Sequence, residues 1–437
     1  MTAYDVVRAV DVDGAFANLL LPQLLRERNL TSTDAAFTTE LTYGTLRWQG
    51  VLDEIIGTAA RRPASALDAP VRAVLRLGAY QLLHMRVPAH AAVDSSVELA
   101  RDNAGHKVTG LVNAVLRAIA KDDFATWVDR VGPSDALGRL AFNAGYPRWV
   151  AAALSDSLGG DLTELRAALA FDRPITHLVA RPGLISRDAL LTAAGSGAEP
   201  GPWSPYAVRL TTGGDPATLA AVRDGRAGVQ DEGSQLAALV LARADGVGDE
   251  RWWLDMCAGP GGKAALLAGL IGDKTRLLAA DLQPHRARLV ARSVGERGVP
   301  LVADGTRPPW RPHSVDRVLL DAPCTGLGAL RRRPEVRWRR KESDVDRLHR
   351  LQVALLRQAL EAVRPGGVVA YVTCSPHLRE TRDVISTVLA DHPAFRREDV
   401  RPYLPGIPDL GDGPDVQLWP HRHGTDAMYV ALLRHRD

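Results

Sequence analysis

The amino-terminal third of the chain has the hydrophobic spacing of α-helices. The apolar positions Val71, Val74, Leu75, Gly78 and Leu82 recur at steps of three and four residues, which places them on one helix face. Asp68 followed by Pro70 is a typical helix start. Similar spacing runs through Phe37–Trp48, Ala92–Ala100 and Leu111–Ile119, without the alternation of strands. The pattern therefore predicts an all-α domain over residues 1–145.

After residue 235 the pattern changes to short apolar runs that alternate with helical segments. The predicted strands are Trp252–Asp255, Leu277–Asp281, Val299–Ala303, Arg317–Asp321 and Val368–Thr373. The helical segments are Ala264–Ile271, Pro284–Arg297 and Asp344–Val363. Such alternation predicts a parallel, doubly wound α/β sheet over residues 236–437. Gln417–Trp419 and Ala427–Leu433 are expected to add an antiparallel hairpin at the edge of this sheet.

Residues 146–235 mix both patterns. Brief strand-like runs occur at His177–Ala180 and Ala207–Leu210, and Leu162–Ala170 and Ala217–Val222 have helical spacing. The Gly- and Pro-rich residues 195–202 have the composition of a loop. We expect a small α+β connecting domain here, and hence a multi-domain chain of three parts.

Composition narrows the class of protein. The 437 residues are 46% hydrophobic and 24% charged, as in ordinary globular proteins, so disorder and coiled coil are set aside. We find no apolar run that approaches the roughly 18 residues of a membrane-spanning helix, and no signal peptide at the amino terminus. Three cysteines are too few for a disulfide framework, which favours a reducing, cytoplasmic location. The net charge of +3 is by itself no signal for nucleic acid.

A glycine loop, Asp255–Lys263, lies between the first predicted strand of the α/β domain and its helix. A phosphate-binding Walker loop would need Gly at Cys257 and Ser or Thr at Ala264, so that reading is excluded. Both NAD and S-adenosylmethionine remain open, because Asp281, 20 residues after Gly261, could meet the ribose hydroxyls of either. A tight turn without a ligand is the third possibility.

Two cysteines follow predicted buried strands. Cys324 comes after Arg317–Asp321, and Cys374 comes after Val368–Thr373. If these are the fourth and fifth strands of the sheet, they are neighbours, and both thiols face the ligand crevice. A thiolate that adds to carbon 6 of cytosine makes carbon 5 nucleophilic toward a methyl donor, and Asp321 could accept from the cytosine amino group.

Other roles for these cysteines are open at this point. A buried cysteine often serves only as a small hydrophobic side chain. Cys374 and His377 form one weak zinc-ligand pair, without a second pair to complete a site. A redox pair is also conceivable, although the two thiols are separated by 50 residues, unlike the CxxC redox motif.

Three motifs together resemble the RNA cytosine-carbon-5 methyltransferases of the RsmB (Sun/Fmu) family. They are Cys257–Lys263, Asp321–Gly328 and Thr373–Ser375. The resemblance covers nearly the whole chain, since residues 1–140 are similar to the NusB-like RNA-binding domain of this family. That similarity is carried by Leu41–Trp48, Leu75–Leu83 and Gly110–Arg117, and Gln230–Gln235 is also typical of the family.

The resemblance implies a Rossmann-like class I methyltransferase domain behind the NusB-like domain. It implies that Cys374 is the nucleophile and that Cys324 assists product release, with Asp321 beside them; DNA cytosine methyltransferases would instead use the position of Cys324. The implied S-adenosylmethionine site consists of Cys257, Ala258, Gly259, Pro260, Gly261, Gly262, Lys263, Asp281, Asp304 and Asp321. Asp304 could face the adenine end of the cofactor, or could simply cap a turn.

We expect the substrate to be 16S ribosomal RNA, and we expect no metal and a monomeric protein. Transfer RNA as the substrate, a non-catalytic ribosome assembly factor that binds RNA, and an oxidoreductase are the alternatives. The chain departs from the family at Gly259, where Ala is frequent, at Thr325, where Ser is common, and at Thr425–Tyr429. The last departure could alter the sheet edge, but we expect it not to touch the proposed chemistry.

A basic segment follows the second motif directly. Its members are Arg331, Arg332, Arg333, Arg337, Trp338, Arg339, Arg340 and Lys341. A solvated loop is the ordinary interpretation of such a run of charge, but its position beside the predicted crevice favours a surface that binds RNA phosphates. Trp338 could stack on a base or pack inward.

Overall fold

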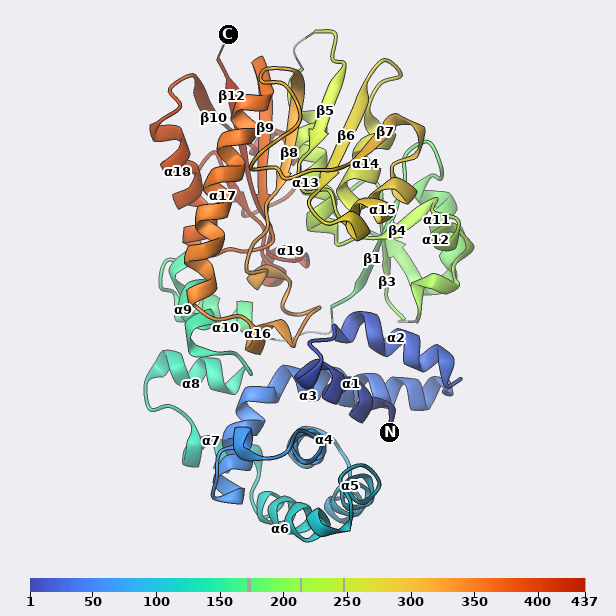
Figure 1. The fold of residues 1–437 in the computed structure, drawn as a ribbon, viewed down its shortest axis with the longest axis vertical. Coiled ribbons are helices and arrows are strands. Elements are labelled where there is room, and N and C mark those ends of the chain that lie inside the picture. Colours follow the sequence, from blue (N-terminus) through green and yellow to red (C-terminus); the bar gives the residue numbers. More distant parts are fainter. Residues whose placement is uncertain (171–173, 213, 247, 437) are drawn as a thin grey trace. The chain divides into compact units, whose positions relative to one another are not determined.

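The computed structural model describes residues 1–170, 174–212, 214–246 and 248–436 (Figure 1). Its contacts divide the chain into two units. A helical unit contains Met1–Phe171 together with Leu330–Glu342, and an α/β unit contains Asp172–Ala329 and Ser343–Asp437. This grouping differs from the expected boundaries at residues 145 and 235. Among the described helices, none has the length and apolarity needed to cross a lipid bilayer.

The helical unit confirms the predicted all-α pattern and extends beyond it. Its helices are α1 (Thr2–Val12), α2 (Ala17–Glu27), α3 (Ser32–Ala60), α4 (Ala69–His84), α5 (Ala89–Ala104), α6 (Thr109–Ile119), α7 (Phe124–Val131), α8 (Ala136–Asn143), α9 (Arg148–Ser157), α10 (Leu162–Leu169) and α16 (Val336–Arg339). Asp68 is the residue before α4, and Pro70 lies in the first turn, as predicted. Helix α3 starts earlier than predicted, because the Thr31 side chain accepts a hydrogen bond from the Asp34 amide and caps it.

A small antiparallel sheet begins the α/β unit. Its strands are β1 (Thr176–Ala180), β2 (Ala198–Pro200), β3 (Ala207–Leu210) and β4 (Ala227–Val229), in the order β2-β3-β1-β4, with α11 (Arg187–Ala194) and α12 (Ala220–Arg223) beside them. The prediction of a loop over residues 195–202 is wrong in part, because β2 forms there. Pro200 is tolerated because β2 is an edge strand.

The larger sheet contains eight described strands. They are β5 (Trp252–Asp255), β6 (Arg276–Asp281), β7 (Gly298–Val302), β8 (Val315–Asp321), β9 (Val363–Thr373), β10 (Phe395–Glu398), β11 (Val416–Gln417) and β12 (Tyr429–His435). The order is β10-β12-β9-β8-β5-β6-β7, and β5 to β9 are parallel, as the alternating pattern predicted. The predicted hairpin of β11 and β12 exists, but its expected place at the sheet edge is wrong. Strand β12 lies between β9 and β10, because it hydrogen-bonds to both.

Helices cover both faces of this sheet (Figure 1). The helices are α13 (Glu232–Arg243), α14 (Gly262–Leu270), α15 (Pro284–Ser293), α17 (Ser343–Ala362), α18 (Arg382–Ala390) and α19 (Pro420–His423). Side chains alternate along each strand, so Leu319 joins the core under α13 and α14, whereas Val318 and Leu320 join the core under α17 and α18. Both faces of the central strands are therefore buried, as parallel sheets require.

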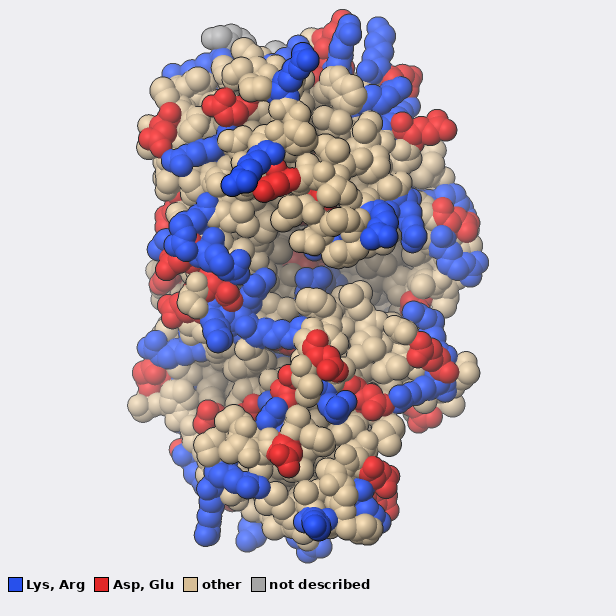
Figure 2. All heavy atoms as spheres, viewed as in Figure 1, with Lys and Arg blue, Asp and Glu red and all other residues tan. Residues whose placement is uncertain are grey.

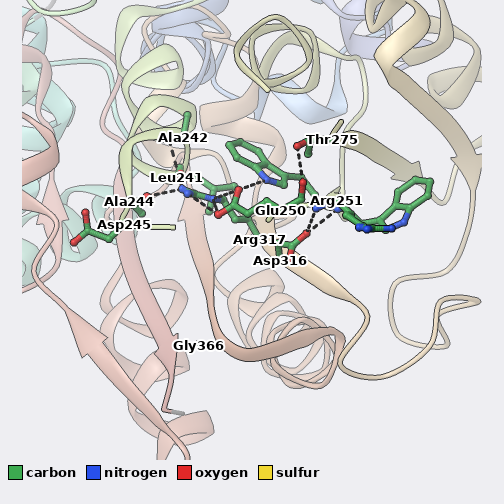
Figure 3. A network of polar contacts seen from close by, with 12 residues as sticks. Leu241, Ala242, Ala244, Asp245, Glu250, Arg251, Thr275, Asp316, Arg317 and Gly366 are labelled. Atoms are coloured by element: carbon green, nitrogen blue, oxygen red, sulfur yellow. Dashed lines mark hydrogen bonds and ion pairs between the residues drawn. The ribbon is translucent and has the colours of Figure 1, made fainter. Parts of the chain in front are cut away.

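A polar network closes the amino-terminal edge of the sheet (Figure 3). The Arg317 guanidinium donates to the carbonyls of Leu241 and Ala244 at the end of α13, at 2.5 and 2.7 Å, and pairs with Glu250. Asp316 accepts from the Arg251 and Trp252 amides, at 2.6 and 2.7 Å. These bonds fix the starts of β5 and β8 relative to each other, at the sheet edge opposite the predicted crevice.

The basic segment belongs to the helical unit by its contacts. Arg337 is 0% exposed, and it donates to the Gly145 carbonyl at 3.0 Å and to the Tyr146 hydroxyl at 2.9 Å. The indole of Trp338 donates to the Arg47 carbonyl, in α3, at 3.1 Å, and the ring packs against the core of the helical unit. The expectation that Arg337 binds RNA phosphate is therefore wrong, because its guanidinium is buried and bound to protein oxygens. Trp338 packs inward, which was the other role considered for it.

The rest of the segment is more accessible. Arg333 and Lys341 are exposed, whereas Arg331, Arg332, Arg339 and Arg340 are half-buried. Arg339 donates to the carbonyls of Val10 and Gly14 in the helical unit. On the face shown in Figure 2, basic and acidic side chains are intermixed over much of the surface. RNA binding by the accessible members of the segment stays a prediction.

Trp338 gives a direct test of the packing role. A Cβ added at Gly50 would lie 2.1 Å from the Trp338 ring, so the ring fills a site shaped for it. Trp338→Ala should lower the free energy of unfolding of the helical unit by about 3 kcal/mol, because it leaves a cavity. A urea titration of the full chain, followed by circular dichroism, measures this. The exposed Arg333→Ala is the control, and unchanged stability in Trp338→Ala together with weaker RNA binding would contradict the packing role.

Candidate active site

Two thiols meet at the carboxyl-terminal edge of the larger sheet. Strands β8 and β9 pair in parallel, with Asp321 opposite Val372. Cys324 and Cys374 follow these strands, and their Sγ atoms lie 3.4 Å apart. Both side chains are half-buried. The strand order had predicted this proximity, and the structure confirms it.

The backbone around the two thiols is cross-linked by hydrogen bonds. The Gly328 amide donates to the Cys374 carbonyl at 2.9 Å, and the Ala427 amide donates to the Gly328 carbonyl at 3.0 Å. A Cβ at Gly328 would lie 2.0 Å from the Ala427 carbonyl oxygen, so only glycine fits there. Thr425–Tyr429 thus reaches the backbone beside Cys374 through Ala427 and Gly328, and that it does not touch the proposed chemistry stays a prediction.

The Cys324 thiol is perturbed by its surroundings. The hydrogen bond with Cys374, and after it burial and the nearby charges of Glu380 and Asp321, raise the pKa of Cys324 well above its usual range. Cys324 therefore keeps its proton at neutral pH and can donate it toward the sulfur of Cys374.

Lys263 is a buried cation of the site. Its Nζ atom lies 2.8 Å from Asp321 Oδ2, and its side chain is 11% exposed. Burial opposes the lysine charge, but Asp321 and, after it, Cys374 and Asp255 outweigh burial and raise the pKa of Lys263. The ammonium group thus remains charged at neutral pH, next to the Asp321 side chain.

Asp255, at the end of β5, was missed as a site residue. It is 1% exposed, and its Oδ2 atom finds no hydrogen-bond partner among the described residues. Burial, and after it the charge of Asp321, raise the pKa of Asp255 to about 8. A carboxylate at the carboxyl end of the first parallel strand was the signal that could have identified it.

The glycine loop is shaped by backbone contacts. Gly261 precedes α14 with φ +114°, a conformation that favours glycine. The Gly259 amide donates to Asp281 Oδ2 at 3.0 Å, and a Cβ at Gly259 would lie 2.4 Å from that oxygen. The glycine at this family-variable position thus lets the Asp281 carboxylate approach the loop. Burial and nearby carboxylates raise the pKa of Cys257 well above its usual range, so this thiol stays protonated.

Asp304 lies in a turn after β7. It is exposed and accepts hydrogen bonds from the Thr306 amide at 2.9 Å and the Thr306 hydroxyl at 2.7 Å. These bonds match the turn-capping alternative for Asp304. Its contact with a cofactor stays a prediction.

Family models match both ends of the chain. Residues 242–434 match the model described as "16S rRNA methyltransferase RsmB/F", and residues 1–121 match the NusB family. A protein of Mycobacterium tuberculosis that is named as a methyltransferase is 52% identical over 99% of this chain and 95% of its own length.

Relatives named after ribosomal RNA are also similar along their whole length. The ribosomal RNA small subunit methyltransferase B of Pseudomonas putida is 32% identical over 99% of this chain and 97% of its own. Among solved structures, that of PH0851 is 24% identical and superposes with a TM-score of 0.84 over 99% of this chain and 97% of its own. NSun6 from Pyrococcus horikoshii, solved with SFG, has a TM-score of 0.56 at 20% identity, over 67% of this chain and 98% of its own. These two structural similarities show a shared fold.

The raised pKa of Asp255 predicts a pH dependence of stability. Between its ordinary value of 3.8 and about 8 the folded carboxyl holds a proton that the unfolded one has lost, so this group makes stability fall as pH rises through that window. Asp255→Asn should remove the effect and raise the melting temperature most at about pH 8. Thermal denaturation across the window measures the difference between the variant and the native chain. The exposed Asp249→Asn is the control, and a difference that does not vary with pH would refute the assignment.

Proposed function

The chain belongs to the RsmB/F family of methyltransferases and carries an amino-terminal NusB-family domain, and from that premise we propose that it forms 5-methylcytosine in 16S ribosomal RNA. The proposal rests above all on one observation, the two thiols 3.4 Å apart. A pair of thiols at the ligand edge of a methyltransferase sheet suits covalent attack on a pyrimidine, whereas a protein that only binds RNA needs neither thiol.

The residues at this edge suit S-adenosylmethionine as the methyl donor. The Asp321 carboxylate and the Asp255 oxygen that has no partner among the described residues suit a cationic ligand, whose charge would favour the ionised form of Asp255. The backbone amides at the start of α14 and the carboxylate of Asp281 suit a carboxylate and ribose hydroxyls respectively. When bound, this cofactor supplies an electrophilic methyl group.

Cys374 is the proposed nucleophile. Its thiolate adds to carbon 6 of cytosine, and the electron pair of the ring double bond moves to carbon 5, which then attacks the methyl group. Carbon 5 afterwards loses its proton to a base, and the electrons of that bond expel Cys374 as thiolate. Lys263 supports the thiolate before attack and after release, because its ammonium group interacts with Cys374.

Cys324 and Asp321 have separate proposed tasks. Cys324 holds its proton beside the Cys374 sulfur, where it can stabilise the departing thiolate during release. The Asp321 side chain is 31% exposed, and its Oδ2 atom pairs with Lys263. Its other oxygen is proposed to accept a hydrogen bond from the cytosine amino group. The target base must leave any duplex stack to reach these groups.

Ribosomal RNA is the proposed substrate because relatives that match the whole chain are named for it. The NusB-family domain is the proposed RNA-docking part, together with the accessible arginines of residues 331–341. Their side chains can bind phosphates without reading the sequence, so they would position the RNA while the site at Cys374 selects the cytosine.

The chemical identity of the product is directly testable. Deleting the protein from its host should remove 5-methylcytosine from at least one position of 16S ribosomal RNA, as read by bisulfite sequencing. Resupplying the native chain should restore it, and resupplying Cys374→Ala should not. If 5-methylcytosine is unchanged in every cellular RNA after deletion, the proposed function is wrong.

The roles of the two thiols predict opposite behaviour of their variants. Cys324→Ala should accumulate a protein–RNA adduct that survives a denaturing gel, because the adduct forms but is released slowly. Cys374→Ala should form no adduct and should lose activity by about four orders of magnitude, as expected for loss of a nucleophile. An adduct in Cys374→Ala and none in Cys324→Ala would reverse the assignment.

A further inference from the structure

A buried carboxylate that the proposed chemistry does not use binds Thr325, the residue that follows Cys324. Glu380 ends the short helical turn Leu378–Glu380 that follows the Cys374 loop, and it is 0% exposed. Burying a carboxyl group is costly unless hydrogen bonds compensate for lost water. The hydrogen-bond partners of the Glu380 side chain therefore indicate its role.

The partners of the Glu380 side chain surround Cys324. Its Oε1 atom accepts from the Thr325 amide at 2.8 Å, and its Oε2 atom accepts from the Thr325 hydroxyl. Gln352, from α17, donates to Glu380 Oε1 at 3.1 Å and to the Pro323 carbonyl at 2.8 Å. Glu380 and Gln352 thus hold the backbone groups on both sides of Cys324, the Pro323 carbonyl before it and the Thr325 amide after it.

The backbone of Glu380 is anchored to β9, the strand that precedes Cys374. The Tyr371 hydroxyl, on β9, donates to the Glu380 carbonyl at 2.7 Å. The Thr325 hydroxyl also lies 3.1 Å from the hydroxyl of Ser375, the residue after Cys374. The network is buried, since Thr325 is 1% exposed and Ser375 and Gln352 are 0% exposed. It is therefore a buried, hydrogen-bonded link between the residues that follow the two thiols.

We propose that Glu380, with Gln352, is a positioning residue that holds the Cys324 thiol against the Cys374 sulfur for the release step. The proposal rests on the proposed function for its chemistry. Glu380 acts through its hydrogen bonds to Thr325, the residue that follows Cys324. Its carboxylate sets where Cys324 stands relative to Cys374.

Release should depend on Glu380 more than adduct formation does. The residues around Cys374 have supports of their own: the Thr373 hydroxyl donates to the Ser375 carbonyl at 2.9 Å, and the His377 amide donates to the Ser375 hydroxyl at 3.3 Å. Neither involves the Glu380 side chain. Loss of Glu380 therefore frees the Cys324 loop while Cys374 stays at the end of β9.

A time course with small-subunit ribosomal RNA from cells that lack the protein, S-adenosylmethionine and the full chain separates the two steps. Glu380→Gln should form the adduct within about twofold of the native rate but release it about tenfold more slowly, and Glu380→Ala should be slower still. The matched control is Glu361→Gln, an exposed glutamate of α17. Equal release by native chain and Glu380→Gln would overturn the proposal, as would equal slowing of both steps.

A second measurement does not depend on methylation. In the resting protein, diamide oxidises neighbouring thiols to a disulfide, and peptide mass spectrometry identifies the pair. The Cys324–Cys374 bond should form about tenfold more slowly in Glu380→Gln than in the native chain. Unchanged cross-linking would overturn the positioning role. Failure of the native chain to form adduct or 5-methylcytosine would instead overturn the proposed function and leave this comparison valid.

Thr325 provides the conservative pair of variants. Thr325→Val removes the hydroxyl that Glu380 accepts from, whereas Thr325→Ser keeps it. Release should slow in Thr325→Val and slow less in Thr325→Ser. If the two variants release the RNA adduct at equal rates, the hydrogen bond from the Thr325 hydroxyl to Glu380 does not position Cys324. That result would overturn the proposal.

Discussion

The parallel pairing of β8 with β9 is the constraint on which the site depends. Because Asp321 lies opposite Val372, the residues that follow the two strands emerge side by side, and the two thiols stand 3.4 Å apart. A register shift of two residues would move one thiol by about 6.6 Å along its strand and separate the pair. The buried cores on both faces of the sheet and the polar network at the opposite edge hold this register. The same packing and hydrogen bonds that stabilise the sheet therefore also place the two thiols.

The carboxyl groups that gather at the carboxyl-terminal edge of the larger sheet destabilise the folded protein. Asp255, Asp281 and Asp321 converge there, and Lys263 is the buried cation among them. The resulting repulsion and burial leave Asp255 with a pKa of about 8 and an oxygen without a partner in the described residues. Functional sites often retain such unsatisfied groups, because a ligand completes them. A cationic ligand is the natural complement of this arrangement.

The basic segment shows why charge density alone is a weak guide. Seven basic residues within Arg331–Lys341 look like a surface for phosphate, yet Arg337 is buried on carbonyl and hydroxyl oxygens. A guanidinium group has five donors and satisfies backbone acceptors as readily as phosphates. The segment thus leaves the α/β unit directly after the Cys324 motif, contributes Trp338 to the core of the helical unit, and returns at α17. The arginines that this packing leaves accessible are the members of the segment that can contact RNA.

The sequence by itself determined most of the helices and strands and the place of the two cysteines at strand ends. Hydrophobic period, glycine and proline act over a few residues, so the helices of the first 145 residues, the parallel strands and the two cysteines at strand ends could be predicted. Strand order even predicted that Cys324 and Cys374 are neighbours. Only the tertiary structure decided which polar groups pair across long separations: Glu380 with Thr325, 55 residues apart, and Arg337 with Tyr146, 191 residues apart. The reason is physical, since these hydrogen bonds follow from how distant elements pack, and no local pattern records a partner that lies far along the chain.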